Sequence, residues 1–274
     1  MDPKITEAAA YLADLRTQQR VEDDLPPELR PGDLEQAYAI ADVLVEMLMH
    51  QSGARLAGYK VACTNPLAQD LLGVTGPIFG RLLSTVIVDS PARLDPAAYT
   101  RRIVEPEFAF VMAEAAPTEQ GPYTEENIAR KIGGLLPGLE IVDHRFTDWT
   151  RLGGPALAAD NAFNGAWVRG TPYAGNWREL DLAGHPVTAR HSNGDVLNGS
   201  GAAVMGHPLT VMAWLANTLN ARGEMLKAGQ YVTTGVATDI LSCDPGEGVE
   251  ADFGTLGTLR VDFCVRFASG KPDT

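Results

Sequence analysis

The chain has 274 residues, of which 45% are hydrophobic, and its formal net charge is -13 at pH 7. This length and composition predict a globular protein with one large domain and at most a small appendage. Basic residues form no cluster beyond isolated pairs, so we expect no nucleic-acid partner, and the acidity disfavours anionic ligands unless a cation or a local basic group captures them.

The first part of the chain is predicted to be helical. One helix covers roughly residues 4–20, and a second follows Asp33, whose side chain is suited to capping a helix start. A polar, proline-rich stretch, "EDDLPPELRPGD", connects them. From about residue 56 short β-like runs and glycine turns take over. We therefore expect a helical N-terminal region over residues 1–56 and a mainly β domain over residues 57–274.

Strands dominate the predicted body. Residues 103–112, "IVEPEFAFVM", form one predicted strand, Asn193-Gly194 signals a hairpin turn, and "GTLRVDFCVRF" at residues 257–267 alternates apolar and polar side chains. Two later helices are expected, one starting at Thr124 and one over "HPLTVMAWLANTLNARG", where Pro208 stands in the first turn. Strands and helices do not alternate regularly, which argues against a doubly wound parallel sheet.

The cysteines and the apolar segments bear on where the protein works. Cys63, Cys243 and Cys264 are far apart, odd in number and form no C-x-x-C pair, which fits a reducing compartment and argues against structural zinc. The N-terminus lacks the basic and apolar pattern of a signal peptide, and no apolar run reaches the length of about 18 residues that a membrane span needs. We expect a cytoplasmic protein without a membrane partner.

Two glutamates share one face of the strand predicted over residues 103–112. The period of two puts Glu105 and Glu107 on the same side, and their repulsion must be relieved by protonation, a basic partner or a metal. Pro106 between them lacks a backbone donor, so we expect this part of the strand at a sheet edge or beside a bulge. A solvated face is the plain alternative. The apolar neighbours on the same face, such as Ala109 and Val111, favour burial instead.

A third carboxylate, Glu140, lies in the apolar stretch "LLPGLEIVDHRF" after a Pro-Gly turn. Three carboxylates with water completing the shell suit Mg²⁺ or Mn²⁺, hard ions that prefer oxygen ligands. The single lysine of "ARLAGYKVACTN", Lys60, either keeps its ammonium group in water or lies buried near these acids as an acid, base or anion clamp.

Two further stretches are candidates for contacts to a ligand. Asp160-Asn161 reads as a turn or a helix cap, and Asn161 is also a candidate for positioning a substrate. Gly199, Ser200 and Gly201 match neither a Walker loop nor a dinucleotide fingerprint, but their backbone amides could hold a carboxylate or phosphate. His207, beside the predicted helix start, is expected to be structural, and no G-x-S-x-G elbow supports a serine hydrolase.

Taken in order, several stretches resemble the 2-keto-4-pentenoate hydratase/4-oxalocrotonate decarboxylase group of the fumarylacetoacetate hydrolase-like superfamily. They are "GYKVACTNPLAQDLLGV", "GPIFGRLL", "EPEFAFVM", "GLEIVDHRF", "ADNAFNGAWV", "GSGAAVMGHPLTVMAWLANTL", "AGQYVTTG" and "DFGTLGTLRVDF", and the likeness spans roughly residues 25–268. The ordered set is specific to the group, although no single motif is. The resemblance implies an α+β fold, a mixed β-roll preceded by a small helical region, and a homo-oligomer.

The resemblance also implies a site. Glu105, Glu107 and Glu140 would hold the divalent metal, and Lys60 would lie near the substrate. Relatives act on 2-oxo or 2-hydroxydienoate acids from aromatic-ring and steroid breakdown, so we expect a small 2-oxo acid as the ligand. The expected activity is addition of water to such an acid by a metal-dependent lyase.

Two departures from the group leave the reaction open. Hydratases of the group commonly carry Pro-Asp before the aromatic-Gly pair, whereas this chain has Pro77-Ile78, an apolar pattern like that of a decarboxylase. His144 stands where relatives often have a small residue, which suggests a different substrate tail. The alternatives are therefore decarboxylation of a 2-oxo-3-enedioate, hydrolysis of an acylpyruvate, and a non-catalytic partner of an active relative. Hydrolysis needs a Glu-His pair that is not recognisable in the sequence.

Overall fold

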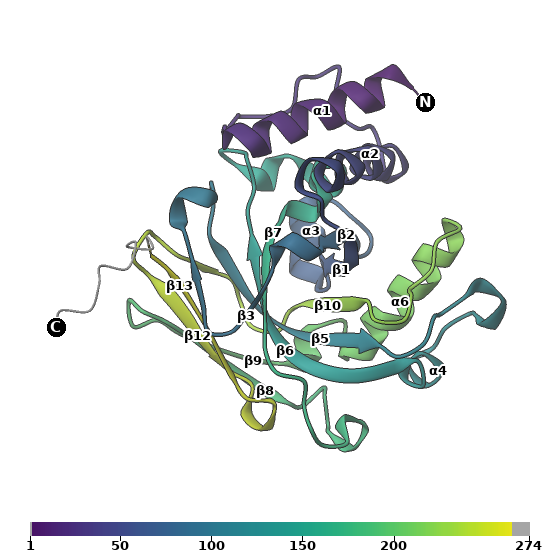
Figure 1. Cartoon of the computed structure of the whole chain (residues 1–274), viewed down its shortest axis with the longest axis vertical. Coiled ribbons are helices and arrows are strands. Elements are labelled where there is room, and N and C mark those ends of the chain that lie inside the picture. Colours follow the sequence, from purple (N-terminus) through teal and green to yellow (C-terminus); the bar gives the residue numbers. More distant parts are fainter. Residues whose placement is uncertain (1, 265–274) are drawn as a thin grey trace.

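The computed structural model describes residues 2–264 and shows helices packed against two curved sheets (Figure 1). The helices are α1 (Pro3–Gln18), α2 (Leu34–Ser52), α3 (Pro66–Leu72), α4 (Glu125–Ala129), α5 (Gly153–Ala159) and α6 (Pro208–Ala221). Helices α1 and α2 lie together at the top of Figure 1, and both were predicted from the sequence. This is the expected α+β class, with a helical N-terminal region before the strands.

Capping residues set the helix ends as the sequence indicates. The Asp33 side chain accepts a hydrogen bond from the Gln36 amide at 2.8 Å, which satisfies one of the free donors at the start of α2. At α6 the side chain of His207 accepts from the Leu209 amide at 3.1 Å, and Pro208 fills the first turn. His207 is thus a helix cap, as expected for a structural residue.

The strands form two mixed sheets. The larger sheet has the order β2-β1-β10-β5-β6-β7-β3, with β11 also pairing with β5, and the smaller has the order β4-β13-β12-β8-β9. The strands are β1 (Leu56–Ala62), β2 (Ile78–Leu83), β3 (Ile87–Asp89), β4 (Ala92–Leu94), β5 (Ile103–Met112), β6 (Ile132–Val142), β7 (Asn164–Arg169), β8 (Pro186–His191), β9 (Val196–Ser200), β10 (Tyr231–Val236), β11 (Leu241–Ser242), β12 (Gly248–Asp252) and β13 (Thr258–Phe263). Strands β8 and β9 form the predicted hairpin around Asn193-Gly194. The end of the strand predicted over 257–267 lies outside the described residues.

The expectation for Pro106 was half right. Strand β5 is not an edge strand, because β10 pairs with it on one side and β6 on the other. The bulge alternative holds instead: the β10–β5 register shifts between Thr233 and Val236, beside Glu107. A proline that cannot donate is tolerated because the ladder is interrupted here, while its carbonyl accepts from the Ala237 amide at 2.8 Å.

The two faces of β5 have different surroundings. One face carries Val104, Phe108 and Phe110, all 0% exposed, in the main core, where Phe108 meets the ring of Phe253 edge-on at 5.4 Å between centroids. Residue Phe253 follows β12, so the smaller sheet covers this face. The opposite face carries Glu105 and Glu107. The charged face of the strand is therefore separated from the main core by the sheet itself.

The N-terminal helices share that main core with the sheets. Buried side chains of α1 and α2, among them Leu12 and Leu44, belong to the same continuous apolar cluster as the strands, and α2 packs against α5. The first strand begins at Leu56, at the predicted end of the helical region. A division at residue 56/57 stays a prediction. Among residues 2–264 no helix combines the length and hydropathy that crossing a membrane requires.

We expect Phe253→Ala to lower the free energy of unfolding by about 3–5 kcal/mol, because it leaves a cavity against Phe108 where the two sheets meet. Urea denaturation would measure the loss. Val196→Ala is the control, since Val196 is 43% exposed and its truncation should change stability by less than about 0.5 kcal/mol. Equal midpoints for the two variants would contradict the packing described.

Candidate metal centre

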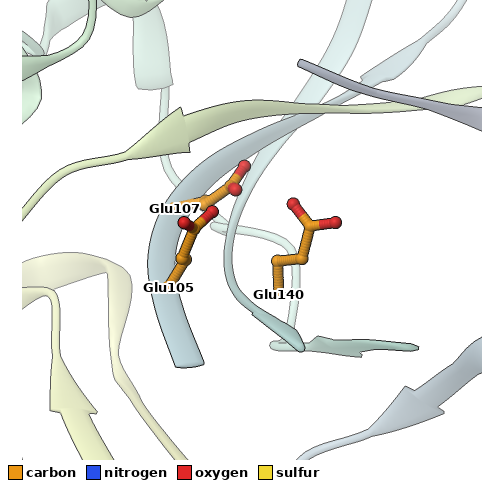
Figure 2. Close-up of side chains that lie close together, drawn as sticks. All are labelled: Glu105, Glu107 and Glu140. Atoms are coloured by element: carbon orange, nitrogen blue, oxygen red, sulfur yellow. The ribbon is translucent and has the colours of Figure 1, made fainter. Parts of the chain in front are cut away.

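Strand register brings the three predicted glutamates together. In the β5–β6 pair Glu105 lies directly opposite Glu140, and Glu107 is two residues further along β5 on the same face. One carboxylate oxygen from each of the three lies within 4.8 Å of the others. Figure 2 shows the three carboxyl groups facing a common space from the two adjacent strands. The solvated-face alternative is excluded for Glu107 and Glu140, which are 0% and 1% exposed, while Glu105 is partly exposed.

Each of the two buried carboxyl groups accepts a hydrogen bond from an amide through one of its oxygens. Glu107 Oε2 accepts from the Gly235 amide at 2.8 Å, and Glu140 Oε1 accepts from Asn164 Nδ2 at 3.1 Å. Within the described residues Glu107 Oε1 has no hydrogen-bond partner, and Glu140 Oε2 meets only the ammonium group of Lys60. Buried oxygens without donors are costly, so this arrangement is suited to an additional electropositive ligand.

Two glycines make room for this arrangement. A side chain at Gly138, opposite Glu107 on β6, would approach Trp167 Nε1 to 2.3 Å. Gly235 lies in the bulge of β10 with φ 97°, and a Cβ there would come within 2.1 Å of Thr64 Oγ1. Only glycine adopts that backbone readily, and the resulting turn aims the amide of Gly235 at Glu107.

The side chain of Lys60 is buried beside the three acids, as one of the two sequence interpretations predicted. It is 1% exposed, and its Nζ donates to the Ala162 carbonyl at 2.9 Å and lies 3.2 Å from Glu140 Oε2. Burial by itself lowers the pKa of Lys60, but the charges of Glu140, Glu105 and Glu107 outweigh it and raise the pKa above the usual value. The ammonium form is therefore the stable form in this site.

Burial has the opposite effect on the carboxyl groups, because it raises their pKa values. Burial raises the pKa of Glu105 to about 7, opposed by Lys60 and reinforced by Glu140. The pKa of Glu107 is raised well above its usual value, first by burial and then by Glu140 and Glu105. When all are ionised, three glutamates and one lysine leave two uncompensated negative charges. A divalent cation would neutralise them, and three carboxylates form an oxygen donor set that suits a hard ion.

The other predicted contacts are placed differently. Asn161 uses both ends of its amide on the backbone of Arg81, accepting from the nitrogen at 2.6 Å and donating to the oxygen at 2.8 Å. The amides of Ser200 and Gly201 donate to the carbonyl groups of Ala237 and His185 at 3.0 and 3.3 Å. These groups fix loops next to the site, and their contact with a substrate stays a prediction.

The Gly199–Gly201 segment nevertheless lies close to the glutamates. A side chain at Gly199 would come within 2.0 Å of the Ala237 carbonyl oxygen, so the two backbones touch. The amide of Ala237 in turn donates to Pro106, which separates Glu105 from Glu107. The segment therefore supports the loop that follows the bulge of β10.

Sequence reasoning missed the groups that orient the site. Asn164, Gly235 and the carbonyl of Ala162 hold Glu140, Glu107 and Lys60 respectively. The hydroxyl of Thr233 and the indole nitrogen of Trp167 are also buried, with no hydrogen-bond partner in the described part of the chain. The motifs "ADNAFNGAWV" and "QYVTTG" contain these residues, but nothing in a motif says which atom of a distant strand it contacts.

Residue His144 lies beyond the end of β6. Its ring is buried against Trp149 and Phe163, with centroids 6.1 and 5.7 Å away. Burial, followed by the charges of Arg101 and Arg145, lowers the pKa of His144 to about 4, so the imidazole is neutral near pH 7. Its influence on a substrate tail remains a prediction.

Known proteins resemble this chain in sequence or in fold. No family model matches the chain. The 2-hydroxyhexa-2,4-dienoate hydratase of Comamonas testosteroni is 32% identical over 233 residues, covering 84% of this chain and 86% of that protein. The 2-keto-4-pentenoate hydratase of Paraburkholderia xenovorans is 30% identical over 232 residues and 84% of each chain. The solved 4-oxalocrotonate decarboxylase from Pseudomonas putida G7, complexed with magnesium and adipate, superposes with a TM-score of 0.88 at 23% identity over 97% and 98% of the two chains.

The mixed sheets give this protein the fold of solved proteins of the fumarylacetoacetate hydrolase-like class. Within that class the chain belongs to the 2-keto-4-pentenoate hydratase/4-oxalocrotonate decarboxylase group. It is accordingly an enzyme, a hydro-lyase or a carboxy-lyase.

The raised pKa values predict that metal binding displaces protons. Because Glu105 has a pKa of about 7 and that of Glu107 is also raised, the metal-free site is partly protonated near neutrality. We expect the apparent Kd for Mn²⁺ to fall about five- to tenfold between pH 6 and pH 7, as protons cease to compete. Calorimetric titrations in buffers of different ionisation enthalpy would count the protons released. A Kd that does not change with pH would contradict this.

Substituting Glu107 by glutamine should separate stability from binding. Carboxyl groups with raised pKa values stabilise the metal-free protein fully below pH 4.5, and this contribution is lost as the pH rises through the folded-state pKa. Metal-free Glu107→Gln should therefore be more stable than the parent at pH 8 by at least about 1 kcal/mol, since less than one unit of pKa shift suffices. Its affinity for Mn²⁺ should fall at least tenfold.

Thermal unfolding at pH 5 and pH 8, with and without Mn²⁺, would measure the stability difference. Glu114→Gln is the matched control, because Glu114 is exposed and pairs only with Lys131. If Glu107→Gln destabilises the metal-free protein at pH 8, the carboxylates do not repel one another as described.

Proposed function

We propose that this protein adds water to a 2-hydroxydienoate or 2-oxo-enoate acid with the help of Mg²⁺ or Mn²⁺. The observation that carries the proposal is the buried Glu105–Glu107–Glu140 centre with the Lys60 ammonium 3.2 Å from Glu140. Such a centre suits a ligand with a carboxylate and an adjacent carbonyl oxygen. We expect the enzyme to work as a cytoplasmic homo-oligomer in aromatic or steroid catabolism.

The three glutamates would hold the metal, since two of them keep a buried oxygen without any other donor than Lys60. A bound divalent ion would polarise the carbonyl group of the substrate and stabilise the enolate form. The glutamates cannot act as mobile bases while they serve as ligands. Proton transfer therefore falls to a group beside them.

We assign that part to Lys60. An ammonium group has three donors, and two of them are directed at the Ala162 carbonyl and Glu140. The third is available to the substrate, where it would clamp the carboxylate or give a proton to the carbon chain as the dienol becomes an unsaturated ketone. Since the three acids raise its pKa, Lys60 starts the cycle as an acid.

The residues next to Lys60 on strand β2 determine which other side chains can contact the substrate. Gly80 is the partner of Lys60 in the β1–β2 ladder, and Ile78 is two residues before it on the same face. Residue Ile78 is 0% exposed, so an apolar side chain stands near Lys60 where hydratases resembling this chain commonly have an aspartate. An apolar group cannot orient a water molecule. This favours a second candidate, decarboxylation of a 2-oxo-3-enedioate, in which the same carbonyl accepts the electrons released with CO₂.

The remaining alternatives have less support. Hydrolysis of an acylpyruvate needs a Glu-His pair, and the group of clustered metal-binding side chains found within residues 2–264 contains only the three glutamates. A nitrogen of His191, at the end of β8 in the smaller sheet, lies 3.5 Å from a Glu247 carboxylate oxygen, but neither residue belongs to the glutamate cluster. A non-catalytic partner would have no need for all three carboxylates and a buried lysine.

Product analysis tests the proposal. The enzyme with Mg²⁺ or Mn²⁺ should convert 2-hydroxypenta-2,4-dienoate to a hydroxylated keto acid, detected by mass spectrometry, without release of CO₂. Release of CO₂ from 4-oxalocrotonate as the sole reaction would replace hydration by decarboxylation. If neither substrate is turned over by protein that demonstrably binds the metal, both candidates fail.

Lys60→Met should lower kcat about 10²- to 10⁴-fold, because it removes the proton donor while keeping an unbranched chain of similar length. Steady-state kinetics on the preferred substrate would measure the loss. Lys131→Met is the control, since Lys131 forms a surface ion pair with Glu114. A Lys60→Met enzyme with wild-type kcat would remove Lys60 from the mechanism.

A further inference from the structure

The segment Asp160–Asn164, between α5 and β7, supports two members of the site at once. The carbonyl of Ala162 receives the Lys60 ammonium at 2.9 Å, and Asn164 Nδ2 donates to Glu140 at 3.1 Å. Any movement of this segment therefore changes the position of both the lysine and a metal ligand.

The backbone of this segment is unusual. Asn161, Ala162 and Phe163 have φ values of 51°, 50° and 56°, in the left-handed region, although none is a glycine. This backbone conformation is unfavourable for residues other than glycine, and it persists only where the surroundings enforce it. The Asn161 side chain, bonded at both ends to the Arg81 backbone, is one such restraint.

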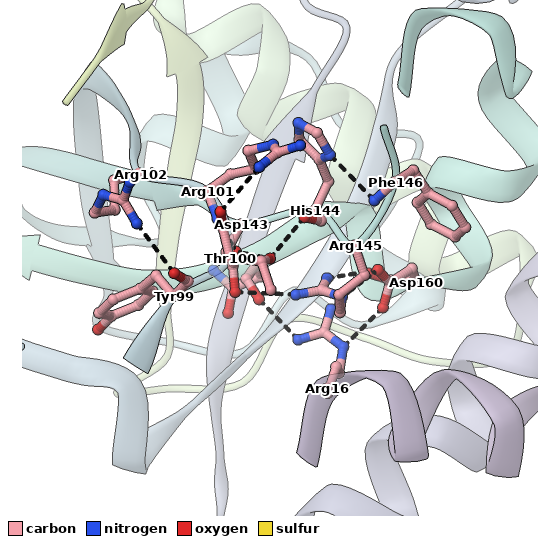
Figure 3. Close-up of polar contacts among 11 residues, drawn as sticks. Arg16, Tyr99, Thr100, Arg101, Arg102, Asp143, His144, Arg145, Phe146 and Asp160 are labelled. Carbon is pink, nitrogen blue, oxygen red and sulfur yellow. Dashed lines mark hydrogen bonds and ion pairs between the residues drawn. The ribbon is translucent and has the colours of Figure 1, made fainter. Parts of the chain in front are cut away.

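A second restraint comes from the N-terminal helix. Arg16, in the last turn of α1, donates to Asp160 Oδ1 at 2.7 Å, to the Asp160 carbonyl at 2.8 Å and to the Asn164 carbonyl at 3.0 Å. One guanidinium group thus binds both ends of the segment, and Figure 3 shows its bond to Asp160. The Asp160 side chain is 0% exposed and that of Arg16 is 15% exposed, so solvent screens these bonds little.

The Asp160 carboxylate has a second arginine partner besides Arg16. Asp160 also pairs with Arg145, which binds Asp143 at 3.0 Å, and the Asp143 side chain accepts from Thr100 (Figure 3). If Arg16 is removed, Asp160 keeps an arginine partner. What is lost is the donor to the two backbone carbonyls, which no other side chain of the network supplies.

We propose that Arg16 is a positioning residue of the active site, through which helix α1 holds Lys60 and Glu140 in place by fixing the backbone of residues 160–164. The inference rests on the proposed function only in taking the Glu105–Glu107–Glu140 site as the catalytic site. It assigns the helical N-terminal region a part in building the metal centre. Lysine cannot replace arginine here, because its single ammonium group cannot span both ends of the segment.

The test is the affinity for Mn²⁺ alone, measured by electron paramagnetic resonance without substrate. Arg16→Ala should weaken Mn²⁺ binding about tenfold and Arg16→Lys by a smaller factor, because Glu140 is no longer held. Leu12→Ala is the matched control: Leu12 is buried on the same helix, so its truncation should lower the melting temperature yet leave the Kd within twofold. Arg20→Ala, at a surface ion pair just after α1, should change neither quantity.

Chemical rescue adds a readout that a structural role alone would not give. A cavity of about 270 Å³ is lined by Arg16, Asn161 and Asn164 among others, so methylguanidinium has room to enter when the arginine is truncated. Millimolar methylguanidinium should restore at least half of the lost Mn²⁺ affinity of Arg16→Ala and leave Leu12→Ala unchanged.

Three results would overturn the inference: an unchanged Kd in Arg16→Ala, an equal loss in Leu12→Ala, or the absence of rescue. If Arg16→Ala does not fold, Arg16→Lys carries the same comparison, and a wild-type Kd in that variant also overturns it. Failure of the proposed function is separate, because it would appear as wild-type protein that binds Mn²⁺ but converts neither oxo-acid substrate.

Discussion

The repulsion among three clustered carboxyl groups, two of them buried, governs the rest of this structure. Glu105, Glu107 and Glu140 converge within 4.8 Å, and a single lysine balances part of their charge. Such a centre is unfavourable on its own, since burial raises the pKa values of Glu105 and Glu107 and leaves oxygens without donors. The fold therefore stores unfavourable electrostatic energy at one place, and a divalent cation is the ligand whose charge and donor preference relieve it.

Backbone irregularities bring main-chain groups to Glu107 and Lys60, while the Asn164 side chain reaches Glu140. The bulge in β10 turns the Gly235 amide toward Glu107, and the left-handed segment after α5 offers the Ala162 carbonyl to Lys60. Main-chain groups are well suited to this work because they are neutral and rigid. They orient Glu107 and Lys60 without adding another titrating group to the site.

The N-terminal helices take part in the same arrangement. They pack on the sheet through a continuous apolar core, and α1 reaches the segment of residues 160–164 through Arg16. A surface helix would ordinarily contribute stability alone. Here the helix that is most distant in sequence from Glu140 binds the backbone next to the side chain that orients Glu140, so packing and the geometry of the metal centre are coupled.

The sequence by itself determined the local features. Alternation along residues 103–112 placed Glu105 and Glu107 on one face, Asp33 and Pro208 marked helix starts, and the ordered motifs identified the group and predicted three glutamates as metal ligands, because these signals depend on neighbours within a few residues. Only the tertiary structure decided that Pro106 sits beside a bulge in a central strand and that Asn161 bonds to Arg81. It also decided that Asn164 contacts Glu140, that Gly235 contacts Glu107, and that Arg16 reaches the backbone of residues 160–164. Those contacts join residues that are 24 to 148 positions apart, and pairing at that range depends on strand register and chain path, which no local pattern encodes.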